Sequence, residues 1–227
     1  MSAKKIAEGL LETGSVHVNL KQPFKLASGR LSPVYVDCRR LISFPELREQ
    51  ITTQFSEIAQ RQIGAQNIDV IAGGETAGIP FAAFLAQKLE KPMIYVRKEP
   101  KGYGKSSQIE GVLKEKQKVL LVEDLVTDGG SKLVFKRGIE AAGGILKHCL
   151  CVFEYRCEKV HLKEAREKLG QHGITLHSLV TWDDLLDLAK GKYLTQEECA
   201  QVLNFLKDPK GWQKRGSGDT IRRRSEV

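Results

Sequence analysis

The sequence predicts an α/β fold in which helices flank a central, mostly parallel sheet. From residue 68 onward, short continuous apolar runs alternate with single helical segments. Apolar runs of this kind are typical of strands buried on both faces, as in βαβ units. The chain has 227 residues, of which 41% are hydrophobic and 28% charged, so it can build one sizeable core and has the composition of a globular protein.

Residues 1–64 precede this alternation and predict a small N-terminal addition, which we call the hood. Its first segment, 4–12, has the apolar spacing of a short helix, and 24–40, punctuated by Ser-Gly and Ser-Pro pairs, predicts a hairpin. A long amphipathic helix is expected over 45–63, because a proline suits its first turn and a glycine follows its last residue.

Residues 65–206 hold the alternating pattern and predict an α/β core with C-terminal helices. No internal repeat or low-complexity linker divides the chain, so we expect one structural domain overall. The stretch 97–110 is too rich in Gly, Lys and Ser to pack and predicts a loop. Strands are expected at 68–72, 93–96, 119–122, 145–153 and 174–180, and helices at 80–89, 131–142, 159–169, 182–189 and 196–206.

Much of the net charge of +8 lies at the C-terminus. Residues 207–227 contain seven Lys or Arg and three acidic residues with weak periodicity, which predicts a flexible basic tail. A patch for a membrane or a nucleic acid is the alternative. We favour the solvated tail and expect neither a membrane nor a nucleic-acid partner.

Cysteine usage and the lack of long apolar segments indicate a cytoplasmic location. The five cysteines form no Cys-x-x-Cys pair, so neither a disulfide framework nor a zinc knuckle is predicted. No stretch approaches the roughly 20 apolar residues of a membrane span. The first residues also lack an apolar signal core.

The most informative segment is Val119–Ser131, where a buried strand delivers Glu123 and Asp124 at its carboxyl end. Ligands of parallel α/β sheets bind at that position. Thr127 and a Gly-Gly-Ser sequence then precede a helix. Converging backbone N–H groups and the positive end of the helix predict a cradle for a phosphate monoester.

The two carboxylates beside this cradle would repel a bare phosphate, so they need other partners. Ribose hydroxyls satisfy them as donors, directly or through a hydrated Mg²⁺. A solvated acidic turn is the alternative. A Walker loop is absent, as is a Gly-x-Gly-x-x-Gly after the first core strand, which disfavours a nucleoside triphosphatase and a dinucleotide dehydrogenase.

This segment resembles the phosphoribosyl-pyrophosphate signature of the type I phosphoribosyltransferases. The shared pattern is an apolar strand, two acids, two apolar residues, a variable pair, a glycine and a hydroxyl residue. The orotate phosphoribosyltransferases match best and over nearly the whole chain, with similar pieces at 24–35, 73–80, 97–105 and 174–186. The resemblance implies the type I phosphoribosyltransferase fold with its N-terminal hood.

The reaction implied by the resemblance joins N1 of orotate to C1 of the ribose of phosphoribosyl pyrophosphate. Its products are orotidine 5′-monophosphate, a precursor of UMP, and pyrophosphate. The resemblance also implies a homodimer whose mobile loop reaches the neighbouring subunit's site. Mg²⁺ is expected as cofactor, carried by the substrate near Glu123 and Asp124 and without direct protein ligands.

Positive charge gathers in the segment that matches the family's mobile loop. Arg97, Lys98, Lys101 and Lys105 are opposed there only by Glu99. The ribose approaches an oxocarbenium ion while pyrophosphate leaves, so cations aimed at the leaving group and exclusion of water would lower the barrier. A glycine-hinged cationic loop can close over a polyanion as lids do. A solvated basic loop is the alternative.

The resemblance assigns roles to individual residues. Asp124, Lys98 and Lys101 are expected to be catalytic. Orotate is expected to contact Thr127, Arg156 and Lys25, because its carboxylate and ring carbonyls suit a guanidinium and other donors. Phosphoribosyl pyrophosphate is expected to contact Arg97, Lys98, Lys101, Glu123, Asp124, Leu125, Val126, Thr127, Asp128, Gly129, Gly130 and Ser131.

Three positions depart from the family pattern. Ala27 in the hood and Ala77 in the pyrophosphate loop stand where members carry lysine, and Tyr103 stands where they carry histidine. If the hood segment is a strand, Lys25 shares a face with Ala27 and could substitute for the missing lysine. Asp128, an acid beside the phosphate cradle, has no explanation at this level.

Two other functions are considered. A transferase for a purine base would use the same chemistry, but Thr127 stands where the hypoxanthine-type enzymes carry an acid. A nucleobase-sensing regulator would need a helix-turn-helix module or a basic face for nucleic acid. The first residues of this chain indicate the hood instead.

Overall fold

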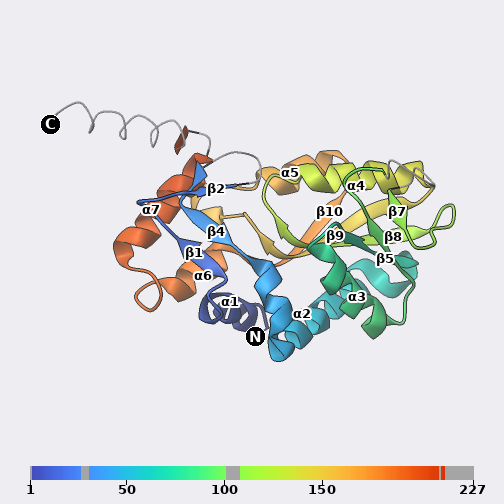
Figure 1. The fold of residues 1–227 in the computed structure, drawn as a ribbon, viewed down its shortest axis with the longest axis horizontal. Helices are drawn as coiled ribbons and strands as arrows, with labels where there is room; N and C mark the ends of the chain where they lie inside the picture. The colour runs from blue at the N-terminus through green and yellow to red at the C-terminus, as the bar shows by residue number, and fades with distance from the viewer. Residues whose placement is uncertain (1, 27–30, 101–107, 210, 213–227) are drawn as a thin grey trace.

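The computed structural model describes residues 2–26, 31–100, 108–209 and 211–212 (Figure 1). The predicted catalytic Lys101, the loop residues Tyr103 and Lys105, the hood residue Ala27 and the tail from residue 213 onward lie outside this part of the chain. Within the described residues, no helix is long and apolar enough to cross a membrane.

A six-stranded sheet forms the centre of the molecule, in the order β10-β9-β8-β5-β6-β7. All of its pairings are parallel except that of β6 with the short edge strand β7. The predicted α/β class is therefore confirmed. The strands are β5 (Val70–Gly74), β6 (Met93–Val96), β7 (Ile109–Glu110), β8 (Lys118–Val126), β9 (Ile145–Glu154) and β10 (Thr175–Thr181).

Alternate side chains of the central strands supply two separate apolar cores, one on each face of the sheet. On β8, Leu120 and Val122 join one cluster and Val119 and Leu121 the other, as expected for strands with a period of two. Helices α4 (Gly130–Ala141) and α5 (Glu164–Gln171) run along one face, and α2 (Pro45–Ile58) and α3 (Gly78–Leu89) lie on the opposite side (Figure 1).

The N-terminal residues share the core on the α2 and α3 side. Ile6 and Leu10 of helix α1 (Ser2–Glu12) are fully buried in the same cluster as Phe55 and Trp182. Helices α6 (Trp182–Ala189) and α7 (Gln196–Lys207) also contribute to that cluster. Burial of this kind ties the hood and the C-terminal helices to the sheet.

The hood contains two small antiparallel pairs rather than one hairpin. β2 (Phe24–Lys25) pairs with β3 (Leu31–Ser32), as predicted, but β4 (Val34–Val36) pairs with β1 (Val16–Val18), which the sequence analysis missed. The hairpin was expected to end at residue 40, but Cys38–Ser43 form a 3₁₀ helix. A strand of three residues is too short to show a clear period in the sequence.

Two further segments differ from expectation. The predicted helix over 159–169 splits into a 3₁₀ turn, Glu158–Val160, and α5, because His161 adopts a left-handed conformation with φ of 56° between them. The strand predicted at 119–122 continues through the two acids to Val126. Backbone pairing of Leu125 with Phe153 and of Val126 with Glu154 extends it.

Candidate active site

The site lies where the order of the strands reverses. The chain passes from β5 outward to β6 and β7, and then returns to place β8 on the other side of β5. In open parallel sheets such a reversal leaves a crevice beyond the carboxyl ends of the two central strands. The loops that follow β5 and β8, at 75–77 and 127–129, therefore flank one opening.

The turn after β8 has the geometry of an anion cradle. Gly129 adopts φ of +75°, and a Cβ at this position would lie 3.0 Å from Cγ of Leu169 on α5, so the turn requires glycine. Helix α4 begins at the next residue. Within the described part of the chain, the N–H groups of Gly129 and Ser131 have no hydrogen-bond partner, and Thr127 is exposed. These groups can hold a phosphate.

Asp128 now has a structural explanation. Its Oδ1 accepts a hydrogen bond from the N–H of Gly130 at 3.2 Å, and its Oδ2 lies 3.6 Å from Nζ of Lys168 on α5. The first contact shapes the start of α4, and the second offsets the negative charge beside the cradle. Lys168 is distant in the sequence, so no local pattern could indicate this pair.

The two acids of the motif have different environments. Glu123 is only 5% exposed, and its Oε2 lies 2.9 Å from Nζ of Lys132 on α4. Burial raises the pKa of Glu123, while the charge of Lys132 opposes that rise. Asp124 is partly exposed; burial raises its pKa as well, and Lys132 again opposes the rise. Asp124 is thus the less buried of the two acids.

The loop after β5 is joined to the first residues of the cationic segment. The N–H of Lys98 donates to Oε2 of Glu75 at 2.9 Å, and Nη1 of Arg97 lies 3.9 Å from Oε1 of the same carboxylate. Gln108 also holds the start of the cationic segment, because it donates hydrogen bonds to the backbone carbonyls of Arg97 and Lys98 at 3.1 Å each. The peptide bond between Glu75 and Thr76 is cis. Arg97 and Lys98 thus stand beside the opening.

Arg156 lies just beyond the carboxyl end of β9, next to the phosphate turn. The register pairs Val126 with Glu154, so Thr127 and Arg156 follow neighbouring strand ends. The Arg156 side chain is 28% exposed; its Nη1 lies 2.7 Å from Oε1 of Glu158, and its Nε lies 3.7 Å from Oε2 of Glu154. Thr127 and Arg156, two of the three residues expected to bind orotate, therefore lie at adjacent strand ends. Of these two, Thr127 lines the cavity described below.

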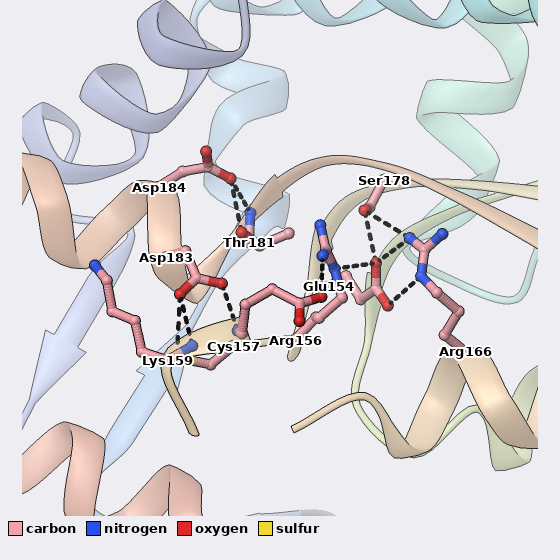
Figure 2. A network of polar contacts seen from close by, with 10 residues as sticks. Glu154, Arg156, Cys157, Lys159, Arg166, Ser178, Thr181, Asp183 and Asp184 are labelled. Atoms are coloured by element: carbon pink, nitrogen blue, oxygen red, sulfur yellow. Dashed lines mark hydrogen bonds and ion pairs between the residues drawn. The ribbon is translucent and has the colours of Figure 1, made fainter. Parts of the chain in front are cut away.

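A polar network holds the segment that carries Arg156 (Figure 2). The fully buried Glu154 carboxylate accepts hydrogen bonds from Arg166 at 2.6 Å and from Ser178 at 2.7 Å. Downstream, Asp183 accepts from the N–H of Glu158 at 2.7 Å. A buried carboxylate such as that of Glu154 needs hydrogen-bond partners. The bonds of Glu154 and the bond from Glu158 to Asp183 hold the chain before and after Arg156.

A cavity of about 230 Å³ opens beside Thr127. Leu26 faces it, whereas the neighbouring Lys25, the third predicted orotate contact, is exposed on β2 and is not part of its lining. The proposed substitution of Lys25 for the lysine missing at Ala27 stays a prediction. The lining comes from the hood, the phosphate turn, the segment after β9 and α7: Leu26, Leu31, Thr127, Asp128, Tyr155, Leu162, Glu164, Phe205, Lys207, Asp208 and Pro209.

Similarity to known proteins extends over most of the chain. The family model of the phosphoribosyl transferase domain matches residues 45–171. The orotate phosphoribosyltransferase of Roseobacter denitrificans is 47% identical over 213 residues, which cover 93% of each chain. That of Rhizobium rhizogenes is 43% identical over 95% of this chain and 92% of its own. The chain belongs to the orotate phosphoribosyltransferase family.

Solved structures of this family share the fold. Orotate phosphoribosyltransferase from Aeropyrum pernix superposes with a TM-score of 0.66 at 27% identity, over 81% of this chain and 98% of its own. UMP synthase from Leishmania donovani gives a TM-score of 0.75 at 25% identity over 90% of this chain, which spans 42% of that longer protein. The resemblance inferred from the phosphate motif is confirmed.

The sequence did not indicate several charged residues of this site. Lys132 and Arg166 neutralise Glu123 and Glu154, and Lys168 lies beside Asp128. Arg39 of the hood donates to the hydroxyl of Tyr35 at 2.6 Å, and its charge opposes the rise in the pKa of Asp124. Only Lys132 had a local signal, as a basic residue in the first turn of a helix, where acids are preferred.

Proposed function

We propose that the chain is an orotate phosphoribosyltransferase. It transfers the 5-phosphoribosyl group from phosphoribosyl pyrophosphate to N1 of orotate and releases orotidine 5′-monophosphate and pyrophosphate, a pentosyl transfer in UMP biosynthesis. The observation that carries the proposal is the turn after β8, where a partly exposed Asp124 precedes a glycine turn whose N–H groups at Gly129 and Ser131 have no partner among the described residues. Arg156 lies beside that turn at the next strand end.

The phosphoribosyl group fits the turn in one orientation. The N–H groups of Gly129 and Ser131 bind the 5′-phosphate, and the Asp124 carboxylate accepts hydrogen bonds from the ribose hydroxyls. This places a negative charge near the ribose as it approaches an oxocarbenium ion, so Asp124 stabilises the transition state as well as the substrate.

The departing pyrophosphate carries several negative charges, so it requires positive charge at the other side of the opening. Lys98 lies there, and its backbone N–H bonds Glu75. Its positive charge opposes the rise in the pKa of Glu123. Lys101 lies outside the described residues and keeps its role as a proposal. Both ammonium groups would stabilise the charge that develops on the departing oxygen.

Orotate is recognised through its carboxylate. The Arg156 guanidinium can bind that group in a bidentate way, with Thr127 and the adjoining cavity receiving the ring. In the structure, Nη1 of Arg156 bonds the exposed Glu158. Orotate therefore has to compete with a solvated carboxylate, which is a weak partner.

Mg²⁺ is proposed to enter with the diphosphate substrate. Asp124 fits this role because it is the less buried of the two acids, whereas Glu123 is bound to Lys132. Among the residues that the structure describes, no group of three or more His, Cys, Asp or Glu is placed to hold a metal ion. When bound, the ion supplies positive charge to the pyrophosphate oxygens.

We further propose that the enzyme works as a cytoplasmic homodimer. The five cysteines are buried and unpaired, which suits a reducing compartment. The dimer and the sharing of the loop that contains Lys101 between subunits follow from the family resemblance. Gel filtration with light scattering would test the dimer.

The ultraviolet absorbance of orotate tests the activity. Purified protein with Mg²⁺ should consume orotate only when phosphoribosyl pyrophosphate is present. Turnover of a purine base in place of orotate would favour the purine transferase. Binding of nucleic acid that weakens with salt, and is lost with residues 208–227, would favour the regulator.

A further inference from the structure

Lys132 is a buried lysine whose donors are fully used. Its residue is 4% exposed. The ammonium nitrogen lies 2.9 Å from Oε2 of Glu123, 2.7 Å from the carbonyl oxygen of Leu125 and 3.2 Å from Oγ of Ser131. An ammonium group has three N–H donors, so each finds one acceptor.

The acceptors come from successive parts of the phosphate site. Glu123 and Leu125 belong to β8 on either side of Asp124, and Ser131 is in the first turn of α4. One ammonium group thus connects the end of the strand to the start of the helix. The peptide units next to Asp124 and the N–H groups of the turn are held in one geometry by these bonds.

This location is otherwise unfavourable for a lysine. The N-terminus of a helix carries partial positive charge, and burial of an ammonium group costs free energy unless the group is paired. The charges of Glu123 and Asp124 and the hydrogen bonds to Leu125 and Ser131 offset these costs. Without Lys132, adjacent negative charges at Glu123 and Asp124 would face an incoming phosphate anion.

Glu123 occupies a confined space between the end of β5 and helix α4. Among the described residues its Oε1 is buried without a hydrogen-bond partner, and a Cβ on Gly74 of β5 would lie 1.6 Å from that atom. The carboxylate therefore fills the volume that the glycine leaves free, and Lys132 is its ion-pair partner there. Loss of Lys132 would leave a buried charge unpaired.

We propose that Lys132 is a positioning residue for the phosphoribosyl substrate. By holding Glu123 in the interior and joining Leu125 to Ser131, it sets Asp124 and the phosphate-binding N–H groups in their working arrangement and leaves a single open carboxylate at the ribose. This inference rests on the proposed function, since it concerns the same site.

Lys132→Met tests the role directly, because the substitution keeps much of the side-chain volume and removes the charge. We expect Kd for phosphoribosyl pyrophosphate, measured by calorimetry with Mg²⁺, and its KM to rise by at least about tenfold, while KM for orotate stays within about twofold. Lys136→Met is the matched control, one turn later on α4, where Nζ bonds the carbonyl of Leu146 at 3.1 Å and Glu140 at 2.6 Å. It should leave both KM values unchanged.

Glu123→Gln and the double variant Lys132→Met/Glu123→Gln separate positioning from folding. The double variant removes the unpaired charge, so its Tm should recover even if Lys132→Met alone unfolds. Its Kd for phosphoribosyl pyrophosphate should still exceed that of Glu123→Gln by about tenfold, because Leu125 and Ser131 remain unconnected.

A double variant that binds phosphoribosyl pyrophosphate as tightly as Glu123→Gln would overturn the proposal, and so would equal weakening of both substrates by folded Lys132→Met. Binding is measured without orotate. A wild-type protein that binds phosphoribosyl pyrophosphate but does not consume orotate would therefore contradict the proposed function and not this inference.

Discussion

Single residues set the shape of the site through close approach. Gly74 ends β5 at the point where the Glu123 carboxylate and the Phe135 ring converge; a Cβ there would lie 1.6 Å from Oε1 and 2.7 Å from Cε2 of the ring. Both neighbours are buried, so neither has room to withdraw. A glycine at this position leaves room for the Glu123 carboxylate of β8 to pack against the end of β5.

Gly74→Ala should therefore lower the free energy of unfolding by about 1–3 kcal/mol through overpacking. It should also weaken binding of phosphoribosyl pyrophosphate, because Glu123 must move. Urea denaturation and calorimetry measure the two effects. Gly170→Ala on α5 is the control: a Cβ there meets nothing within 4 Å, so stability should stay the same or rise slightly.

Arg156→Lys tests the recognition of orotate at the same scale. A lysine keeps the charge and loses the planar pair of donors, so KM for orotate should rise by about tenfold or more while KM for phosphoribosyl pyrophosphate changes little. Steady-state kinetics with each substrate varied in turn gives both values. Arg61→Lys, at an exposed position, should behave as wild type; an equal KM for orotate in both variants would remove Arg156 from the base site.

At the level of elements, the last two strands of the sheet carry a histidine pair. Nδ1 of His148 on β9 lies 3.2 Å from Nε2 of His177 on β10. Burial, followed by the charges of His148 and Arg166, lowers the pKa of His177 from 6.5 to about 4. The folded protein thus favours neutral His177, and the unfolded chain binds a proton at higher pH.

Stability should consequently fall as pH drops from about 6.5 toward about 4. After allowance for solvent around the partly exposed ring, His177 should account for about 1–2 kcal/mol of that loss. Urea unfolding at several pH values would show a smaller slope for His177→Gln than for wild type. The exposed His17→Gln on β1 is the control; identical slopes in all three proteins would contradict the assignment.

Helices and strands with a clear periodic spacing of apolar residues could be predicted from the sequence. Strands of two or three residues and a left-handed turn without glycine could not. β6 and α6 were predicted with the bounds observed, Met93–Val96 and Trp182–Ala189, because apolar spacing decides such segments. β1 and β7 have three and two residues and exist through pairing with distant strands. The left-handed turn at His161 splits the helix expected over 159–169. Such turns usually carry glycine or asparagine, so a histidine there gave no indication of it.

The candidate site divides in the same way. Asp124 and the glycine turn belong to one local motif, so the sequence was enough to locate them. Arg156 was assigned by resemblance to the family, and its role stays a prediction. The partners of Asp128 and Glu154, which are Lys168 and Arg166, come from other elements. So does Arg39, whose charge opposes the rise in the pKa of Asp124. Their roles depend on packing, which a single sequence does not display.

The whole molecule brings the hood, the sheet and α7 around one cavity. Leu26, Thr127 and Phe205 are far apart in the chain and line the same space beside the phosphate turn. Phe205 is in turn covered by Trp212, with the rings edge to face at 5.5 Å. A ligand held there should therefore stabilise the entire fold, because the hood, the sheet and α7 all contribute to one apolar cluster.

Phosphoribosyl pyrophosphate with Mg²⁺, at about 100 times its Kd, should raise the free energy of unfolding by about 2.7 kcal/mol. Asp124→Asn keeps the shape of the side chain and removes the charge, so the same concentration should give a clearly smaller rise in Tm. Differential scanning fluorimetry measures both. A ligand-induced shift that is equal in the two proteins would show that Asp124 does not hold the ribose.

The central claim is that the turn after β8 binds the sugar through its hydroxyls and its 5′-phosphate together. A crystal structure with orotidine 5′-monophosphate tests it most directly. We predict the phosphate on the N–H groups of Gly129 and Ser131, the ribose hydroxyls on Asp124 and the base carboxylate on Arg156. Nucleotide density at another place, with this turn free of ligand, would contradict the account.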